Sequence, residues 1–123
     1  MDVRPLVSIV DDDPSVRKAL RRLCTAAGYR VDLFDSSESF LDAGVAYTTD
    51  CLILDLHLPG KSGLELQAEL VAVDKHFPIV FITAYGDEHA RRQAMESGAN
   101  DFLSKPLDAK RLLKVIGDAV SER

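Results

Sequence analysis

Short apolar runs alternate with longer amphipathic stretches five times along this chain of 123 residues. The runs are rich in β-branched residues, and the third and fourth are apolar at every position, as expected of strands buried on both faces. They occupy residues 6–10, 29–34, 51–54, 79–82 and 102–103. This alternation predicts an α/β fold of the (βα)5 type, in which helices cover both faces of a doubly wound, five-stranded parallel sheet.

Local signals indicate where the intervening helices begin. Asp13 is expected to cap the first helix, because Pro14 suits the first helical position that follows. Asp35, with Glu38 three residues later, resembles a capping box and predicts the start of a short second helix.

The third helix is expected to carry four apolar side chains, which are Leu64, Leu66, Leu70 and Val73.

The charge balance argues against direct binding of nucleic acid by this chain. It has 20 acidic and 15 basic residues, which gives a net charge of −5. Affinity for a polyphosphate comes from lysine and arginine side chains that neutralise phosphates. Any action on DNA therefore requires another domain or another chain.

Cysteine usage and hydropathy indicate the compartment. The two cysteines, Cys24 and Cys51, lie in apolar stretches without C-x-x-C spacing, and we expect buried thiols in a reducing compartment. No signal peptide opens the chain, and no window approaches the roughly 20 apolar residues of a membrane span. These features predict a soluble, cytoplasmic protein with no membrane partner.

Polar side chains are expected at the carboxyl ends of the strands. In the flavodoxin-like strand order 2-1-3-4-5, ligands bind beyond these ends, at the switch between the first and third strands. Asp11 and Asp12 follow the first strand, Asp55 the third, Thr83 the fourth and Lys105 the fifth. Clustered carboxylates repel one another, and an oxygen-only ligand set suits Mg²⁺ or Mn²⁺. The sequence therefore predicts a site for a hard divalent cation.

The same side chains are suited to acylphosphate chemistry. A carboxylate such as that of Asp55 can act as a nucleophile and form an aspartyl-phosphate. The Lys105 ammonium can pair with a carboxylate or with a phosphoryl group placed on one. Thr83 and the backbone N–H of Ala84 offer hydrogen bonds to phosphoryl oxygens.

From Val7 to about Val120, the chain resembles the receiver domain of two-component response regulators, which has the CheY-like fold. The resemblance rests on four segments that occur in order and at the spacing of that family. They are the acid pair Asp11–Asp12, residues 54–60 followed by Gly63, residues 81–84 and residues 98–106. The chain is similar to FixJ-type regulators through residues 10–17 and 101–106.

This resemblance implies a phosphoacceptor and a metal site. Asp55 is expected to accept a phosphoryl group from the phosphohistidine of a sensor histidine kinase or a histidine phosphotransfer protein. Asp12 is expected to bind Mg²⁺ directly and Asp11 through water. Asp55 itself and the backbone carbonyl of His57 complete the protein ligands that the resemblance implies.

The resemblance also implies which residues respond to the phosphoryl group. Thr83 and Lys105 are expected to bind its oxygens. Phe102 is expected to be an aromatic switch that turns inward as Thr83 moves toward the phosphate. The Lys105–Pro106 peptide bond is expected to be cis, an isomer that is found mainly before proline.

Two bulky side chains and one surface complete the expected switch. His57 and Tyr85 are expected to shape the access of the hydrolytic water and thereby set the lifetime of the phosphorylated state. The fourth helix, fifth strand and fifth helix are expected to form the signalling face. Through this face the domain would control an output, such as a transcription-regulating domain or partner, and form a homodimer on phosphorylation.

We expect residues 1–123 to form one receiver domain, with no second domain in this chain. FixJ-type regulators usually continue into a helix-turn-helix DNA-binding domain. Two alternatives therefore stay open: an excised receiver of a longer DNA-binding regulator, and a single-domain protein.

Three other classes of protein compete with this interpretation. An aspartate-nucleophile phosphohydrolase is suggested by the Asp11-x-Asp13 pattern, but it needs a second acidic pair that the segment after Thr83 does not supply. An FMN-binding carrier needs a hydroxyl- and glycine-rich loop, whereas residues 11–15 are acidic. A degenerate receiver would act by protein contact without phosphorylation. Because the expected chemical residues are present, we predict a phosphorylatable switch and not an enzyme that turns over an external substrate.

Overall fold

The centre of the molecule is a five-stranded parallel sheet, seen in a computed structural model that describes residues 2–74, 77–84 and 86–121. Its strands are β1 (Leu6–Val10), β2 (Arg30–Phe34), β3 (Cys51–Asp55), β4 (Ile79–Thr83) and β5 (Asp101–Ser104). The order is β2-β1-β3-β4-β5, and every neighbouring pair is parallel. The predicted α/β class, (βα)5 arrangement and strand order are confirmed, and strand bounds differ from the predicted ones by one residue at most.

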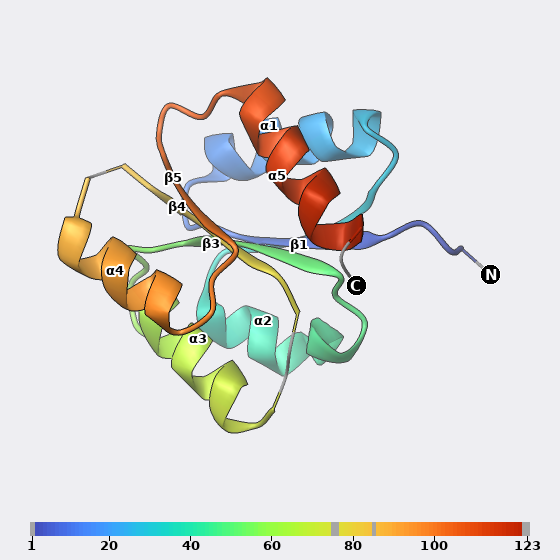
Figure 1. Ribbon diagram of the computed structural model, residues 1–123. Helices are drawn as coiled ribbons and strands as arrows, with labels where there is room; N and C mark the ends of the chain where they lie inside the picture. Colours follow the sequence, from blue (N-terminus) through green and yellow to red (C-terminus); the bar gives the residue numbers. More distant parts are fainter. Residues whose placement is uncertain (1, 75–76, 85, 122–123) are drawn as a thin grey trace.

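Helices cover both faces of this sheet (Figure 1). They are α1 (Pro14–Ala26), α2 (Ser37–Ala43), α3 (Gly63–Ala72), α4 (Glu88–Glu96) and α5 (Ala109–Ser121). A short 3-10 helix, η1 (Val45–Tyr47), lies between α2 and β3 and was not predicted. Figure 1 shows α1 and α5 on one side of the sheet and α2, α3 and α4 on the other.

Each face of the sheet has its own apolar core. Alternate side chains of the central strands point to opposite faces. One face packs against the buried residues of α1 and α5, which include Leu20, Cys24, Leu112 and Ile116. The other face packs against residues of α2, α3 and α4, which include Phe40, Leu66, Leu70, Ala90 and Ala94.

Helix α4 has the smallest buried side chains of the helices that cover the sheet. Its buried residues are Ala90 and Ala94, whereas α5 buries Leu112 and Ile116. A side chain of α3 provides a further link, because the Nε2 of buried Gln67 donates to the backbone carbonyl of Ala94 at 3.0 Å. The contacts that hold α4 are therefore two buried methyl groups, the partly buried Met95 and a hydrogen bond from α3.

The first helix begins as predicted, and the third ends earlier than predicted. The Asp13 carboxylate accepts a hydrogen bond from Ser15 N at 2.8 Å and caps α1. Val73 was expected on the apolar face of the third helix, but it is the C-cap residue and is 58% exposed. The helix ends there because Asp74 adopts a positive φ of 59°, which a right-handed helix does not accommodate.

The predicted capping box of the second helix is wrong. The N-cap residue of α2 is Ser36, not Asp35, and the Ser36 hydroxyl accepts a hydrogen bond from Ser39 N at 3.0 Å. Ser36 has extended backbone angles (φ −154°, ψ 160°), which allow a short side chain to reach the free N–H groups of the first turn. Glu38 is therefore not the third-position partner of an Asp35 capping box.

Cys24 and Cys51 are both buried thiols, as predicted. Burial raises the pKa of the Cys24 thiol to about 11, so this thiol is not a reactive thiolate at neutral pH. Within residues 2–74, 77–84 and 86–121, no helix has the length and apolar character needed to cross a membrane.

Candidate functional site

The polar residues predicted at the strand ends lie together at the carboxyl edge of the sheet. Asp11 directly follows β1, and Asp55 is the last residue of β3. One carboxylate oxygen from each of Asp11, Asp12 and Asp55 lies within 4.8 Å of the others. They meet because β1 and β3 are adjacent and parallel, so both strands end at the same edge.

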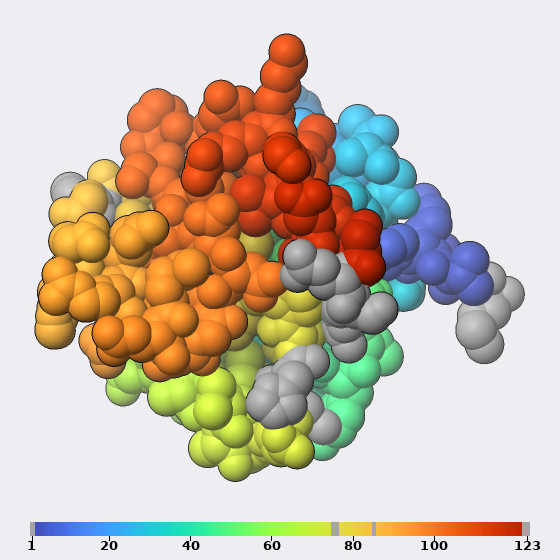
Figure 2. Space-filling view, in the orientation of Figure 1, coloured from blue at the N-terminus to red at the C-terminus, as the bar shows by residue number. Residues whose placement is uncertain are grey.

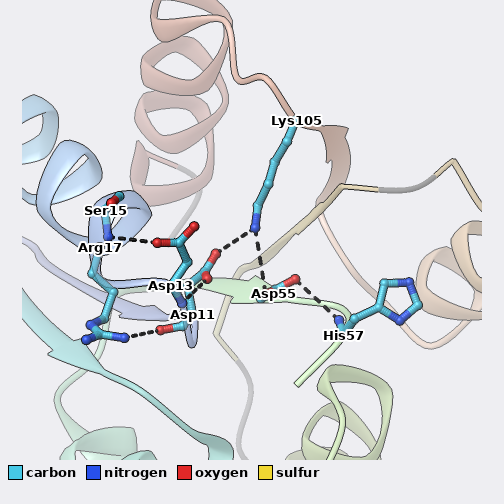
Figure 3. Close-up of polar contacts among 7 residues, drawn as sticks. All are labelled: Asp11, Asp13, Ser15, Arg17, Asp55, His57 and Lys105. Carbon is cyan, nitrogen blue, oxygen red and sulfur yellow. Dashed lines mark hydrogen bonds and ion pairs between the residues drawn. The ribbon is translucent and has the colours of Figure 1, made fainter. Parts of the chain in front are cut away.

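Lys105 reaches across this cluster from the end of β5 (Figure 3). Its Nζ lies 2.9 Å from Asp11 Oδ2 and 3.7 Å from Asp55 Oδ2. The Lys105 backbone N–H donates to the carbonyl of Thr83 at 2.7 Å, which fixes the start of the lysine against β4. The Lys105–Pro106 peptide bond is cis, the isomer that the resemblance implies.

Asp11 is the most firmly held of the three carboxylates. It is fully buried, and its Oδ1 accepts a hydrogen bond from Asp13 N at 2.9 Å. The Arg17 guanidinium on α1 donates to the backbone carbonyl of Asp11 at 2.7 Å (Figure 3). Asp12, by contrast, is exposed. The role of Arg17 could not be inferred from the sequence, where it is only one of four basic residues in this helix.

Asp55 is buried among groups that disfavour its ionised form. Its exposed fraction is 4%, and burial followed by the charge of Asp11 raises its pKa from 3.8 to about 6. The Lys105 charge and a hydrogen bond from His57 N at 3.3 Å act in the opposite direction. Asp55 is therefore a carboxylate at neutral pH and a carboxylic acid in mild acid.

The Lys105 ammonium stays charged in this site. Partial burial lowers its pKa, but the hydrogen bond to Asp11 and the charges of Asp11, Asp55 and Asp12 outweigh that effect. The net result is a pKa above the ordinary lysine value. A permanent positive charge thus lies beside two buried carboxylates.

The backbone after Asp55 is packed tightly against the site. Leu56 N donates to the carbonyl of Ile82 at 2.9 Å, and Gly63 N donates to the carbonyl of Leu56 at 3.2 Å. Ser62 and Glu65 form a reciprocal capping box at the start of α3. Neither the capping box nor the Gly63 contact was predicted from the sequence, although Ser62 and Glu65 have the spacing of this motif.

The other predicted residues that the structure describes differ in burial. Thr83 is buried at the end of β4, and Ala84 after it is exposed. Phe102 is half-buried, with its ring centroid 6.1 Å from that of Phe81. The His57 side chain is exposed, and its ring points away from Asp55 in Figure 3. Tyr85, predicted to influence hydrolysis, lies outside the described residues.

The donor chemistry of the cluster fits a hard divalent cation. Asp11, Asp12 and Asp55 present only oxygen donors, and their three negative charges exceed the single positive charge of Lys105 beside them. Mg²⁺ prefers oxygen ligands, usually one or two carboxylates with water. The exposed Asp12 leaves one side of the cluster accessible to solvent.

The chain belongs to the response regulator receiver domain family, which it matches over residues 7–117. Receiver domains act as phosphoacceptor switches that are phosphorylated by histidine kinases, and they use Mg²⁺ at an acidic pocket. The acidic cluster at the end of β1 and β3 stands at the corresponding place in this fold.

Several curated relatives are transcriptional regulators. Nodulation protein W of Bradyrhizobium diazoefficiens is 42% identical over 113 residues, which is 92% of this chain and 50% of that protein. Transcriptional regulatory protein FixJ of the same species is 36% identical over 122 residues, which is 99% of this chain and 60% of that protein. The chain therefore spans about half to three fifths of the length of these relatives.

Solved structures show the same fold. The response regulator StyR is 43% identical with a TM-score of 0.90, over 98% of this chain and 61% of that one. The structure called FixJ-N is 34% identical with a TM-score of 0.87, over 100% of this chain and 98% of that one. This likeness confirms the predicted resemblance to FixJ-type receivers.

Proposed function

We propose that this chain receives a phosphoryl group on Asp55, in a Mg²⁺-dependent reaction, from a histidine kinase or a histidine phosphotransfer protein. The observation that carries the proposal is the position of the Asp55 carboxylate. It lies at the end of a central strand, 3.7 Å from the Lys105 ammonium and beside the carboxylates of Asp11 and Asp12. A pKa of about 6 leaves Asp55 ionised, and thus nucleophilic, at neutral pH.

The chemistry is an in-line displacement at phosphorus. One oxygen of Asp55 forms a bond to the phosphorus of the phosphohistidine, the P–N bond breaks, and its electron pair remains on the imidazole nitrogen. Lys105 exchanges its contact with Asp11 for one with the transferred phosphoryl group, whose charge it neutralises. Thr83 and the backbone N–H of Ala84 donate to the other phosphoryl oxygens.

The metal ligands in this proposal are Asp11, Asp12, Asp55 and the backbone carbonyl of His57. When bound, Mg²⁺ or Mn²⁺ supplies positive charge that offsets the charge of the phosphoryl oxygens. The buried Asp11 stays in place during this process, because Asp13 N and Arg17 hold its side chain and its backbone.

The output is proposed to use the surface made by α4, β5 and α5. Figure 2 shows residues 88–104 and the residues of α5 side by side on one face of the molecule. Arg111 of α5 pairs with Asp101 of β5 at 3.8 Å and links two of the three elements. Phe102 acts there as the switch residue, and phosphorylation shifts an existing equilibrium between two arrangements of this face.

We further propose that residues 1–123 form one receiver domain in the cytoplasm. Its signal passes to a transcription-regulating domain or partner, and a homodimer forms through α4, β5 and α5 on phosphorylation. The longer regulators among its relatives support such an output. The excess of acidic over basic residues supports the absence of direct contact between this domain and nucleic acid.

Intact mass spectrometry after incubation with acetyl phosphate and Mg²⁺ tests the acceptor and the metal together. We expect the protein to gain one phosphoryl group, and we expect no gain for Asp55→Asn or after chelation of the metal. Asp42→Asn is the matched control, because Asp42 is an exposed carboxylate on α2, and it should be phosphorylated like the parent.

Equal phosphorylation of Asp55→Asn would show that Asp55 is not the acceptor. If the parent gains nothing, a titration with beryllofluoride followed by NMR distinguishes rapid hydrolysis from an inert site. Absence of any spectral change would favour a receiver that acts by contact alone.

We also expect the side chains of His57 and Tyr85 to determine how long the phosphoryl group persists. Bulky side chains hinder the approach of water to an acyl phosphate, so His57→Ala and Tyr85→Ala should lose phosphate several-fold faster than the parent. The measurement is the decay of the phosphorylated mass after removal of the donor. Decay rates equal to that of the parent in both variants would contradict the prediction.

A further inference from the structure

The loop between β3 and α3 is held by a carboxylate from a different helix. Glu38 lies on α2, and its Oε2 accepts a hydrogen bond from Lys61 N at 3.0 Å. The same oxygen lies beside Gly60, where an added Cβ would come within 2.6 Å of it. Gly60 also has a φ of 73°, a conformation that favours glycine. Gly60 thus has two reasons to be glycine, which are its positive φ and the close approach of the Glu38 carboxylate.

The contact with Lys61 is the main interaction that the structure gives to Glu38. Ser36 is the N-cap residue of α2, and the Glu38 carboxylate extends to the loop, where Lys61 N donates to it. The hydrogen bond from Lys61 N is the largest cause of a lowered pKa at Glu38. The Lys61 side chain turns the other way and pairs with Glu69 on α3. Lys61 therefore connects α2 on one side to α3 on the other.

One end of this loop is bound to the phosphoacceptor and the other end to the residue that follows it. His57 N donates to Asp55 Oδ1 at 3.3 Å, and Gly63 N donates to the carbonyl of Leu56 at 3.2 Å. Between these two fixed points, the contact with Glu38 restrains the middle of the loop. A loop held at three points has little freedom to change the direction of the carbonyl of His57.

We infer that Glu38 is a positioning residue for the divalent-cation site, because it holds the loop that presents the backbone carbonyl of His57. This inference rests on the proposed function, which makes that carbonyl a metal ligand. Groups that orient metal ligands typically change metal affinity by about 10- to 100-fold when they are removed. In this inference Glu38 acts through the loop, by its contacts with Gly60 and Lys61.

Three variants distinguish the effect of the hydrogen bond between Glu38 and the loop from the effect of the negative charge of Glu38 on a nearby cation. Glu38→Ala removes the acceptor, Glu38→Gln keeps an acceptor oxygen without the charge, and Asp42→Ala removes an exposed carboxylate one turn further along α2. Mg²⁺ affinity is measured by NMR titration, and hydrogen exchange of the Lys61 amide is measured in the metal-free proteins. Thermal unfolding of each variant verifies that it is folded.

We expect Glu38→Ala to bind Mg²⁺ about tenfold more weakly and to exchange the Lys61 amide faster. Glu38→Gln should restore most of both properties, and Asp42→Ala should match the parent. Affinity or Lys61 exchange unchanged in Glu38→Ala would overturn the inference, as would equal weakening in all three variants. Failure of the parent itself to bind Mg²⁺ would instead overturn the proposed metal site, and the inference with it.

Discussion

Replacing Gly63 by alanine is expected to destabilise the protein by about 3 kcal/mol, because overpacking a tight backbone contact forces neighbouring groups to move. A Cβ at Gly63 would lie 2.5 Å from the backbone oxygen of Asp55 and 3.1 Å from Leu56 Cα and Phe81 Cε1. The first two are backbone atoms of β3 and of the segment after it, so the strand end that carries the phosphoacceptor must shift. The measurement is urea unfolding, with phosphorylation by acetyl phosphate as the functional readout.

Gly117→Ala provides a matched control within α5. There the nearest atom to an added Cβ is the Tyr29 hydroxyl at 3.8 Å, an ordinary contact. Alanine favours the helix over glycine, so this variant should be more stable than the parent by roughly 0.5 to 1 kcal/mol. A Gly63→Ala protein as stable as the parent would show that the loop can accommodate a methyl group.

The metal-free Asp55→Asn variant is expected to be more stable than the parent at pH 7.5, by about 2 kcal/mol and at most about 3 kcal/mol. Burial and the charge of Asp11 raise the pKa of Asp55 from 3.8 to about 6 in the folded protein. Ionised Asp55 therefore opposes folding in the absence of a cation. Asparagine has a similar shape and carries no charge, so it removes this cost.

The pH dependence has a defined sign. Between pH 3.8 and pH 6 the folded state holds a proton on Asp55 that the unfolded state has lost, so the contribution of Asp55 to stability falls as the pH rises through this window. The difference between Asp55→Asn and the parent should thus be small near pH 4 and reach its plateau above pH 6. Urea unfolding at several pH values measures it, with Asp42→Asn as the control. A difference independent of pH would contradict the assignment.

Much of the site could be predicted because it depends on topology. Once five parallel strands are expected, residues that follow neighbouring strands must meet at one edge, and the strand order alone predicts that Asp11, Asp12 and Asp55 lie together, as they do. Lys105 was placed at the cluster for the same reason. The sequence left open whether it pairs with a carboxylate or awaits a phosphoryl group, and the structure brings its ammonium nearest to Asp11.

The contacts that were not predicted join side chains to the backbone of distant segments. Glu38 was assigned to its own helix, yet it reaches Lys61, 23 residues away. Gln67 donates to the carbonyl of Ala94, 27 residues away. Such pairs depend on how α2, α3 and α4 pack on the sheet. Local sequence patterns report only on residues that are close together along the chain, so they do not predict contacts of this kind. The Ser36 cap was missed for another reason: two adjacent residues both have suitable side chains, and backbone angles decide between them.

Helix α4 packs on the sheet through the smallest buried side chains of the five helices, together with the partly buried Met95, so we expect its displacement to cost little free energy. Its buried apolar groups are the methyl groups of Ala90 and Ala94, each of which contributes roughly 0.8 kcal/mol, and the hydrogen bond from Gln67 adds about 1 kcal/mol. The sum is comparable to the coupling free energy, about 1 to 3 kcal/mol, that usually links two sites of a protein. Larger buried side chains hold the other helices, namely leucines and an isoleucine in α1, α3 and α5 and Phe40 in α2. The molecule therefore combines a stable scaffold with one element of low local stability.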